Sequence, residues 1–91
     1  MPVTRIEFIA PVSLEEVYRQ LAVQTELPAH FGHNLDALFD VLTTDIPGPV
    51  QIVWHRHDAS ATALGHEHYT ALLAVLRDAA NDRPDLELIL D

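Results

Sequence analysis

The chain has 91 residues, enough for a single hydrophobic core and too few for two, so we expect one domain spanning residues 1–91. Apolar residues make up 48% of the chain, and the absence of cysteine excludes a disulfide scaffold, a thiol nucleophile and a thiolate metal site. Acidic residues outnumber basic ones by 14 to 5, for a formal net charge of −9. This charge disfavours binding to nucleic acid or to an anionic membrane and favours a basic protein partner, although solubility alone would also explain it.

No leader of basic and then apolar residues begins the sequence. No apolar run approaches the roughly 20 residues that a membrane-spanning helix needs. We therefore expect a soluble, cytoplasmic protein that is monomeric when free.

The first predicted element is a strand over residues 3–9, which Pro11 ends. Ser13 and Glu16 have the spacing of a capping box and predict the start of a helix. The buried side of this helix would carry Val17, Tyr18 and Leu21.

A turn region around Pro28 and Gly32 leads to a second predicted helix, for which Asn34 is the expected N-cap. Its apolar residues recur at the helical spacing i, i+3, i+4 and i+7: Leu35, Leu38, Phe39 and Leu42.

A rigid break at residues 47–49 precedes a short buried strand over residues 50–54. The chain is expected to be helical again from Ser60, with a long helix over about residues 67–80, and to end in a strand over residues 86–90. Three strands separated by helices predict an α/β fold with a parallel sheet and crossover connections.

The second helix carries two carboxylates at a costly spacing. Asp36 and Asp40 are four residues apart, so a helix stacks one above the other, at a cost of roughly 0.2–0.5 kcal/mol on an isolated helix. Asp40 also lies near the helix C-terminus, where negative charge is unfavourable. Both border the buried stripe beside Phe39 and Thr43, which favours a binding surface for a basic partner. A solvated helix face remains the alternative.

Paired carboxylates are also used in general acid–base catalysis. That chemistry needs a cleft, a substrate pocket and often a basic residue, and the five scattered arginines indicate no such pocket. We therefore expect no catalytic residue and no enzyme activity. We expect the remaining candidate acids to be ordinary solvated charges: Glu7, Glu15, Glu16, Asp58, Glu67 and Asp82.

The six histidines occur in three close pairs: His30 with His33, His55 with His57, and His66 with His68. A strand would place His55 and His57 on one face, but without a third ligand we favour surface histidines over a metal site, and expect no cofactor. Because His30 and His33 precede the acidic helix, neighbouring carboxylates could favour their charged forms and make partner binding sensitive to pH near neutrality.

The segment "LPAHFGHNLDALFDVLT" is similar to the hallmark segment of the barstar family, intracellular inhibitors of a secreted bacterial ribonuclease. The resemblance covers nearly the whole chain, including a buried strand ending in Trp54, "VLRDA" and the closing "LELIL". It implies a three-stranded parallel sheet packed with about four helices. It also implies a partner-binding surface made by the second helix and the loop before it.

The resemblance implies a role for individual residues. The aspartate matching Asp40 lies where the ribonuclease would bind an RNA phosphate, and Asp36 lies on the same surface. Asn34, Phe39, Thr43 and Asp78 match further contact positions, the last of them peripheral.

The chain departs from the family prototype on this surface. His30 and Phe31 replace two adjacent tyrosines, and Thr44 and Asp45 replace a Gly-Trp pair. Phe39 replaces a tryptophan, and His33 replaces a glutamate. The partner therefore need not be the prototype's ribonuclease.

From the acidic helix and this resemblance we expect a barstar-like inhibitor that blocks the active site of a basic ribonuclease and protects the producing cell. The alternatives are a binding module of the same fold for another basic toxin or enzyme, and a small hydrolase. The predicted partner-binding residues are His30, Phe31, Asn34, Asp36, Phe39, Asp40, Thr43, Thr44 and Asp78.

Overall fold

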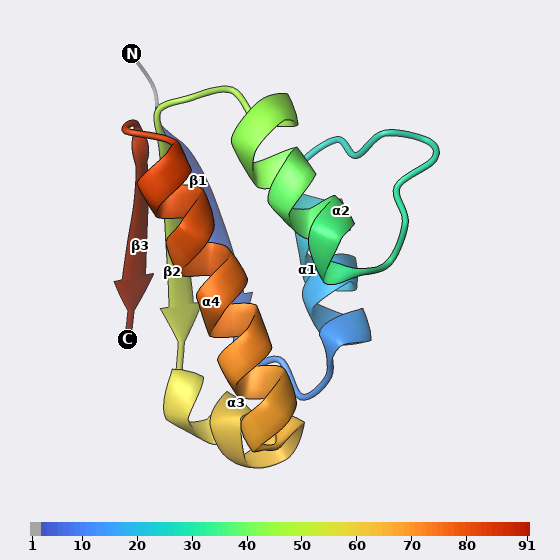
Figure 1. The fold of residues 1–91 in the computed structure, drawn as a ribbon, viewed down its shortest axis with the longest axis vertical. Coiled ribbons are helices and arrows are strands. Elements are labelled where there is room, and N and C mark those ends of the chain that lie inside the picture. The colour runs from blue at the N-terminus through green and yellow to red at the C-terminus, as the bar shows by residue number, and fades with distance from the viewer. Residues whose placement is uncertain (1–2) are drawn as a thin grey trace.

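Three parallel strands form a sheet in the order β1-β2-β3, and helices cover one of its faces (Figure 1). The strands are β1 (Thr4–Ile9), β2 (Val50–His55) and β3 (Leu86–Leu90) in the computed structural model, which describes residues 3–91. The helices are α1 (Leu14–Gln24), α2 (Leu35–Asp40), α3 (His57–Leu64) and α4 (His66–Asp82), and a π-helical turn, η1 (Val41–Asp45), continues α2. The predicted α/β fold with a parallel sheet and four helices is confirmed.

The core lies between the sheet and the helices. Ile6, Ile52 and Leu88 are paired across the three strands and all point to the helix side. The completely buried apolar side chains from the helices are Val17, Leu21, Leu38, Leu42, Leu76 and Ala79. Trp54 at the end of β2 is also fully buried, and its indole N–H donates to the hydroxyl of Ser60, 3.1 Å away. This bond satisfies the polar atom of the largest side chain in the core.

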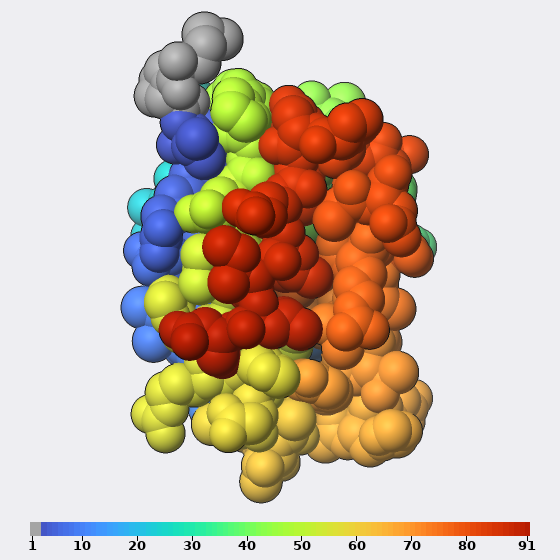
Figure 2. All heavy atoms as spheres, turned by 90° about the vertical axis from the view of Figure 1, so that its left-hand side faces the viewer, coloured from blue at the N-terminus to red at the C-terminus, as the bar shows by residue number. Residues whose placement is uncertain are grey.

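The opposite face of the sheet, which we call the open sheet face, is uncovered, and the three strands lie side by side on it (Figure 2). Its residues alternate with the core residues along each strand, so that register places them in three rows: Arg5, Gln51 and Glu87; Glu7, Val53 and Ile89; Ile9, His55 and Asp91. Most of these side chains are polar, as expected for a sheet face in contact with water.

The boundaries that follow β2 differ from the sequence-based prediction. Strand β2 continues to His55, and α3 begins at His57 instead of Ser60. Arg56 between them has φ 54°, a left-handed conformation that turns the chain sharply from strand to helix. The prediction that His55 and His57 share one face of a strand is therefore wrong. The ring of His57 instead packs on the helix side, with Nδ1 3.0 Å from the Tyr69 hydroxyl.

Within residues 3–91, no helix is both long enough and apolar enough to cross a membrane.

Candidate functional site

The start of α2 is fixed by Asn34, as the sequence predicted. The Asn34 side-chain oxygen accepts a hydrogen bond from the Ala37 N–H at 2.8 Å, and its backbone N–H donates to the Gly32 carbonyl at 2.7 Å. The N-cap therefore holds both the helix and the preceding loop. Because Oδ1 caps the helix, the Asn34 amide is left to present its NH₂ group to any partner.

The face of α2 is divided as its periodicity predicts. Leu38 is fully buried, Phe39 is half-buried, and Asp36 and Asp40 are exposed. The helix continues through η1, where the Thr43 hydroxyl donates to the Phe39 carbonyl at 2.8 Å. That bond uses the hydroxyl proton of Thr43, so its oxygen is left as an acceptor.

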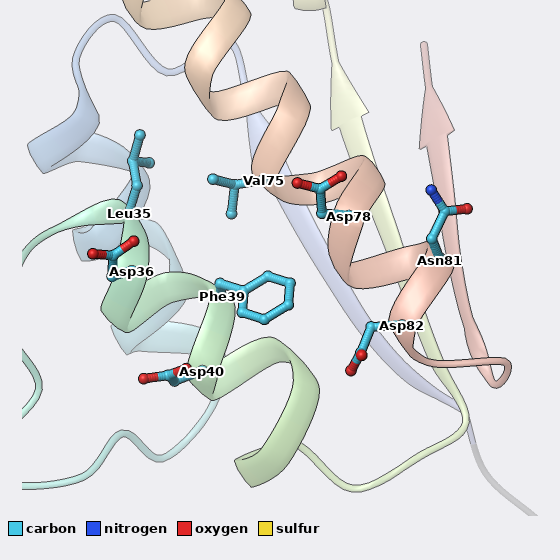
Figure 3. Close-up of a pocket in the computed structure, with 8 residues that line it drawn as sticks. All are labelled: Leu35, Asp36, Phe39, Asp40, Val75, Asp78, Asn81 and Asp82. Carbon is cyan, nitrogen blue, oxygen red and sulfur yellow. The ribbon is translucent and has the colours of Figure 1, made fainter.

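A groove of about 670 Å³ runs between α2 and α4 (Figure 3). We call it the acidic groove, and it is lined by Leu35, Asp36, Phe39, Asp40, Val75, Asp78, Asn81 and Asp82. The Phe39 ring projects from α2 toward α4, between the two sets of carboxylates (Figure 3). The structure thus brings together four of the predicted contact residues: Asp36, Phe39, Asp40 and Asp78.

The wall contributed by α4 repeats the charge pattern of α2. Asp78 and Asp82 are four residues apart, like Asp36 and Asp40, so each helix presents a stacked pair of carboxylates to the groove. Asp82 is the last residue of α4, and no basic residue lies in the last turn of that helix. Both features raise the free energy of the folded, unbound protein.

Asp82, which was expected to be an ordinary solvated charge, is exposed, and the structure also places it on the groove wall. The same i, i+4 spacing that drew attention to Asp36 and Asp40 could have identified it.

Within the described residues, 3–91, the four groove carboxylates have no partner of opposite charge. Among residues 3–91, none of them forms a side-chain hydrogen bond or an ion pair, and no basic residue lines the groove. The resulting negative potential is partly focused by the apolar walls that Leu35, Phe39 and Val75 provide. The groove is therefore suited to receive cationic groups.

Arg83 ties the two walls of the groove together at one end. Its Nη1 donates to the Leu42 carbonyl at 2.9 Å, and its Nε donates to Asp85 Oδ1 at 2.7 Å. The hydrogen bonds and charge of Arg83 hold the pKa of the Asp85 carboxyl below its usual value. Any side chain at Gly48 would collide with this ion pair, because an added Cβ would lie 2.5 Å from Arg83 Nη2.

The remaining predicted residues lie around the groove. His30, Phe31 and Asp40 line a neighbouring cavity of about 120 Å³, so Asp40 belongs to both concavities. Thr43 and Thr44 lie on η1, outside the acidic groove. The contact role of these residues stays a prediction.

The loop before α2 rests on α1. Phe31 and His33 pack against the buried ring of Tyr18, with ring centroids 5.9 and 5.8 Å away. His33 Nδ1 lies 3.2 Å from Glu15 Oε2. Burial, with a contribution from the Glu15 charge, raises the pKa of Tyr18. The carboxylate nearest to His33 is thus Glu15 on α1, which was expected to be an ordinary solvated charge.

His55 forms a second polar cluster, on the open sheet face. Its Nε2 lies 2.8 Å from Glu7 Oε1, and its Nδ1 lies 2.9 Å from Asp91 Oδ2. These hydrogen bonds raise the pKa of His55 and lower that of Glu7. Glu7 was expected to be an ordinary solvated charge, and the structure instead pairs it with His55. The described residues contain no group of three or more side chains arranged to hold a metal ion.

The fold and the groove together define a class of small α/β protein whose second helix presents acids beside an aromatic ring. Comparison with known proteins identifies the family. Residues 1–90 match the family described as "Barstar (barnase inhibitor)". The chain is also 30% identical over 73 residues to "Putative ribonuclease inhibitor YrdF" of Bacillus subtilis (strain 168), covering 80% of this chain and 79% of that protein. The chain belongs to the barstar family, and the predicted resemblance is confirmed.

Proposed function

We propose that this protein inhibits a basic ribonuclease by inserting the acidic helix α2 and the loop before it into the active site of the enzyme. The observation that carries the proposal is the acidic groove, where four carboxylates lie without a cationic partner among the described residues. Family membership supports the same function, because the family is described as an inhibitor of barnase.

In this mechanism, Asp40 occupies the place of an RNA phosphate and pairs with the cationic groups that would otherwise bind it. Asp36 pairs with cations on the same surface, and Phe39 supplies an aromatic face against which a guanidinium group can stack. A carboxylate carries negative charge as a phosphate does but contains no bond that the ribonuclease can cleave. The complex is therefore stable, and the cell that produces the enzyme is protected.

Charge complementarity also predicts how the complex forms. A strongly acidic inhibitor and a basic enzyme attract each other over several ångströms. The association rate should therefore be high at low ionic strength and should fall as salt is added. A hydrolase, by contrast, would turn over its substrate with no protein partner present.

The test is a titration of ribonuclease activity. Barnase, and the ribonucleases secreted by the source organism, are each assayed for RNA hydrolysis with increasing amounts of this protein at low salt. We expect the activity of at least one of them to fall linearly to zero at a 1:1 ratio. A folded protein that leaves every one of these activities unchanged contradicts the proposal.

A double variant tests whether the groove is responsible. Asp36→Ala/Asp40→Ala should lose the inhibition, whereas Glu67→Ala/Glu87→Ala, which removes the same amount of charge elsewhere, should retain it. Equal loss in both variants would mean that only net charge matters. If the protein captures a different basic enzyme through the same two aspartates, the target is another toxin or enzyme and the surface is unchanged.

A further inference from the structure

The two edges of the sheet belong to β1 and β3, and the β1 edge is occupied by side chains of α1. Thr4 and Ala10 donate their backbone N–H groups toward β2, to Pro49 and His55. Because backbone groups of a strand alternate in direction, Glu7 and Ile9 direct their N–H and C=O groups away from the sheet. These are the groups that another strand would use if it paired with this edge.

Two glutamines satisfy the four outward-facing groups of Glu7 and Ile9. The same alternation turns the backbone groups of Arg5 outward, but neither glutamine bonds to them. The Gln24 amide accepts from the Glu7 N–H at 2.8 Å and donates to the Glu7 carbonyl at 2.7 Å. The Gln20 amide accepts from the Ile9 N–H at 2.8 Å and donates to the Ile9 carbonyl at 3.2 Å. Each primary amide therefore offers one donor and one acceptor to the strand, as a peptide group of a neighbouring strand would.

The spacing of the two glutamines matches the strand. Residues four apart on a helix rise by about 6 Å, and residues two apart on a strand rise by about 6.6 Å. A helix running along a strand can thus place amides from positions i and i+4 opposite alternate residues of that strand. Gln20 is further held by Glu16, whose carboxylate accepts from its Nε2 at 3.2 Å.

We propose that Gln20 and Gln24 close the β1 edge against the addition of a strand from a second copy of this chain. The two amides take the place of a fourth strand, and they do so without a backbone that could itself be extended into a larger sheet. An unprotected edge next to an uncovered sheet face would be a site for edge-to-edge association. This role is independent of the acidic groove and of any inhibitor activity.

The test uses Gln20→Ala/Gln24→Ala with Gln51→Ala as the matched control. Gln51 also uses its side chain to bond two neighbours, Arg5 and Glu87, but it lies on the central strand, away from both edges. In the edge variant we expect the amide protons of Glu7 and Ile9 to exchange with solvent at least about tenfold faster than in the native protein. The amide protons of the core residues Ile6 and Phe8 should keep their protection.

Association is measured on the same samples by sedimentation velocity from low to high protein concentration. The edge variant should form dimers and larger species in a concentration-dependent manner, while the native protein and Gln51→Ala stay monomeric. If the Glu7 and Ile9 amides lose protection but the variant remains as monomeric as the control, the proposal is overturned. It is also overturned if those two amides keep their native protection at a concentration at which the variant is monomeric.

Single variants keep the test decisive if the double variant does not fold. Gln24→Ala should expose the Glu7 amide alone, and Gln20→Ala should expose the Ile9 amide alone, each with a smaller increase in association. Exposure of the same amides in both single variants would indicate general loosening of α1 and would contradict the proposed one-to-one pairing.

Discussion

The acidic groove and the open sheet face are both exposed and both carry acids, but they treat those acids in opposite ways. On the open sheet face, Glu7 and Asp91 bind His55, and Glu87 accepts a hydrogen bond from Gln51 at 2.9 Å. In the groove, none of the four carboxylates has such a partner among residues 3–91. The groove thus gathers four of the acids that have no cationic partner among residues 3–91.

This difference separates charge that serves the fold from charge that serves binding. Acids that are paired within the protein contribute to its own stability. The stacked acids of the groove repel each other, and Asp82 also lies at the C-terminal end of α4, so these charges cost stability until a cation arrives. Such a cost is expected at a functional surface, where residues are selected for their effect on the complex.

The largest expected effect is on the affinity for the ribonuclease. Asp40→Ala should weaken binding by at least about 30-fold, the roughly 2 kcal/mol that defines a hot-spot residue, because it leaves the cations of the enzyme unpaired. Glu87→Ala removes the same charge from the open sheet face and should change affinity by about twofold or less. Titration calorimetry of both variants checks the contrast, and similar losses would erase the distinction between the two surfaces.

Arg83→Ala tests the tie between the groove walls and should have the next largest effect. The variant loses the charged hydrogen bond to the Leu42 carbonyl and should lower the free energy of unfolding by about 2 kcal/mol. Urea denaturation measures this, with Arg77→Ala as the control, because Arg77 is an exposed arginine on α4. An equal loss in the two variants would show that the tie contributes nothing specific.

The sequence predicted these features to different degrees, and the separation of interacting residues along the chain explains why. The N-caps at Ser13 and Asn34 were predictable because each acts on a residue three positions later. The division of α2 into buried and acidic faces was predictable from the helical spacing of its apolar residues. Asp82 was missed although its spacing from Asp78 carries the same signal.

The polar clusters of the sheet could not be predicted from local patterns. Glu7 and His55 are 48 residues apart in sequence and meet only because β1 and β2 pair in a particular register. The amides of Gln20 and Gln24 likewise find the β1 edge only once α1 is packed along it. Helical periodicity marks these glutamines as polar positions and gives no sign of their backbone partners.

Asp82→Asn should change the stability of the protein and its affinity for the partner in opposite directions. Removing this charge from the end of α4 should raise the free energy of unfolding by about 0.5 kcal/mol, since it relieves the helix dipole and the repulsion from Asp78. Binding should weaken by about two- to fivefold. On the open sheet face, Glu7→Gln should instead lower stability, because Glu7 is paired with His55. Thermal unfolding and calorimetry on both variants check these signs, and a loss of stability in Asp82→Asn would contradict the cost assigned to the groove.

The smallest effect expected is a pH dependence of stability that originates on the open sheet face. The pKa of His55 is raised above 6.5 in the folded protein by its bonds to Glu7 and Asp91, so the protonated form is favoured by folding. The stabilisation that protonated His55 contributes is therefore fully present below pH 6.5 and is lost as the pH rises through the pKa that His55 has in the folded protein. The pKa of Glu7 is lowered below 4.5, so its contribution is lost only as the pH falls through that lower value.

Urea denaturation at intervals between pH 6 and pH 9 should thus show a decline in the free energy of unfolding that His55→Gln reduces. Asp40→Asn, which alters the groove, should leave the decline unchanged. If His55→Gln retains the full decline, the pH dependence comes from other groups. The pairing of His55 with Glu7 and Asp91 would then not stabilise the fold, and this difference between the open sheet face and the acidic groove would disappear.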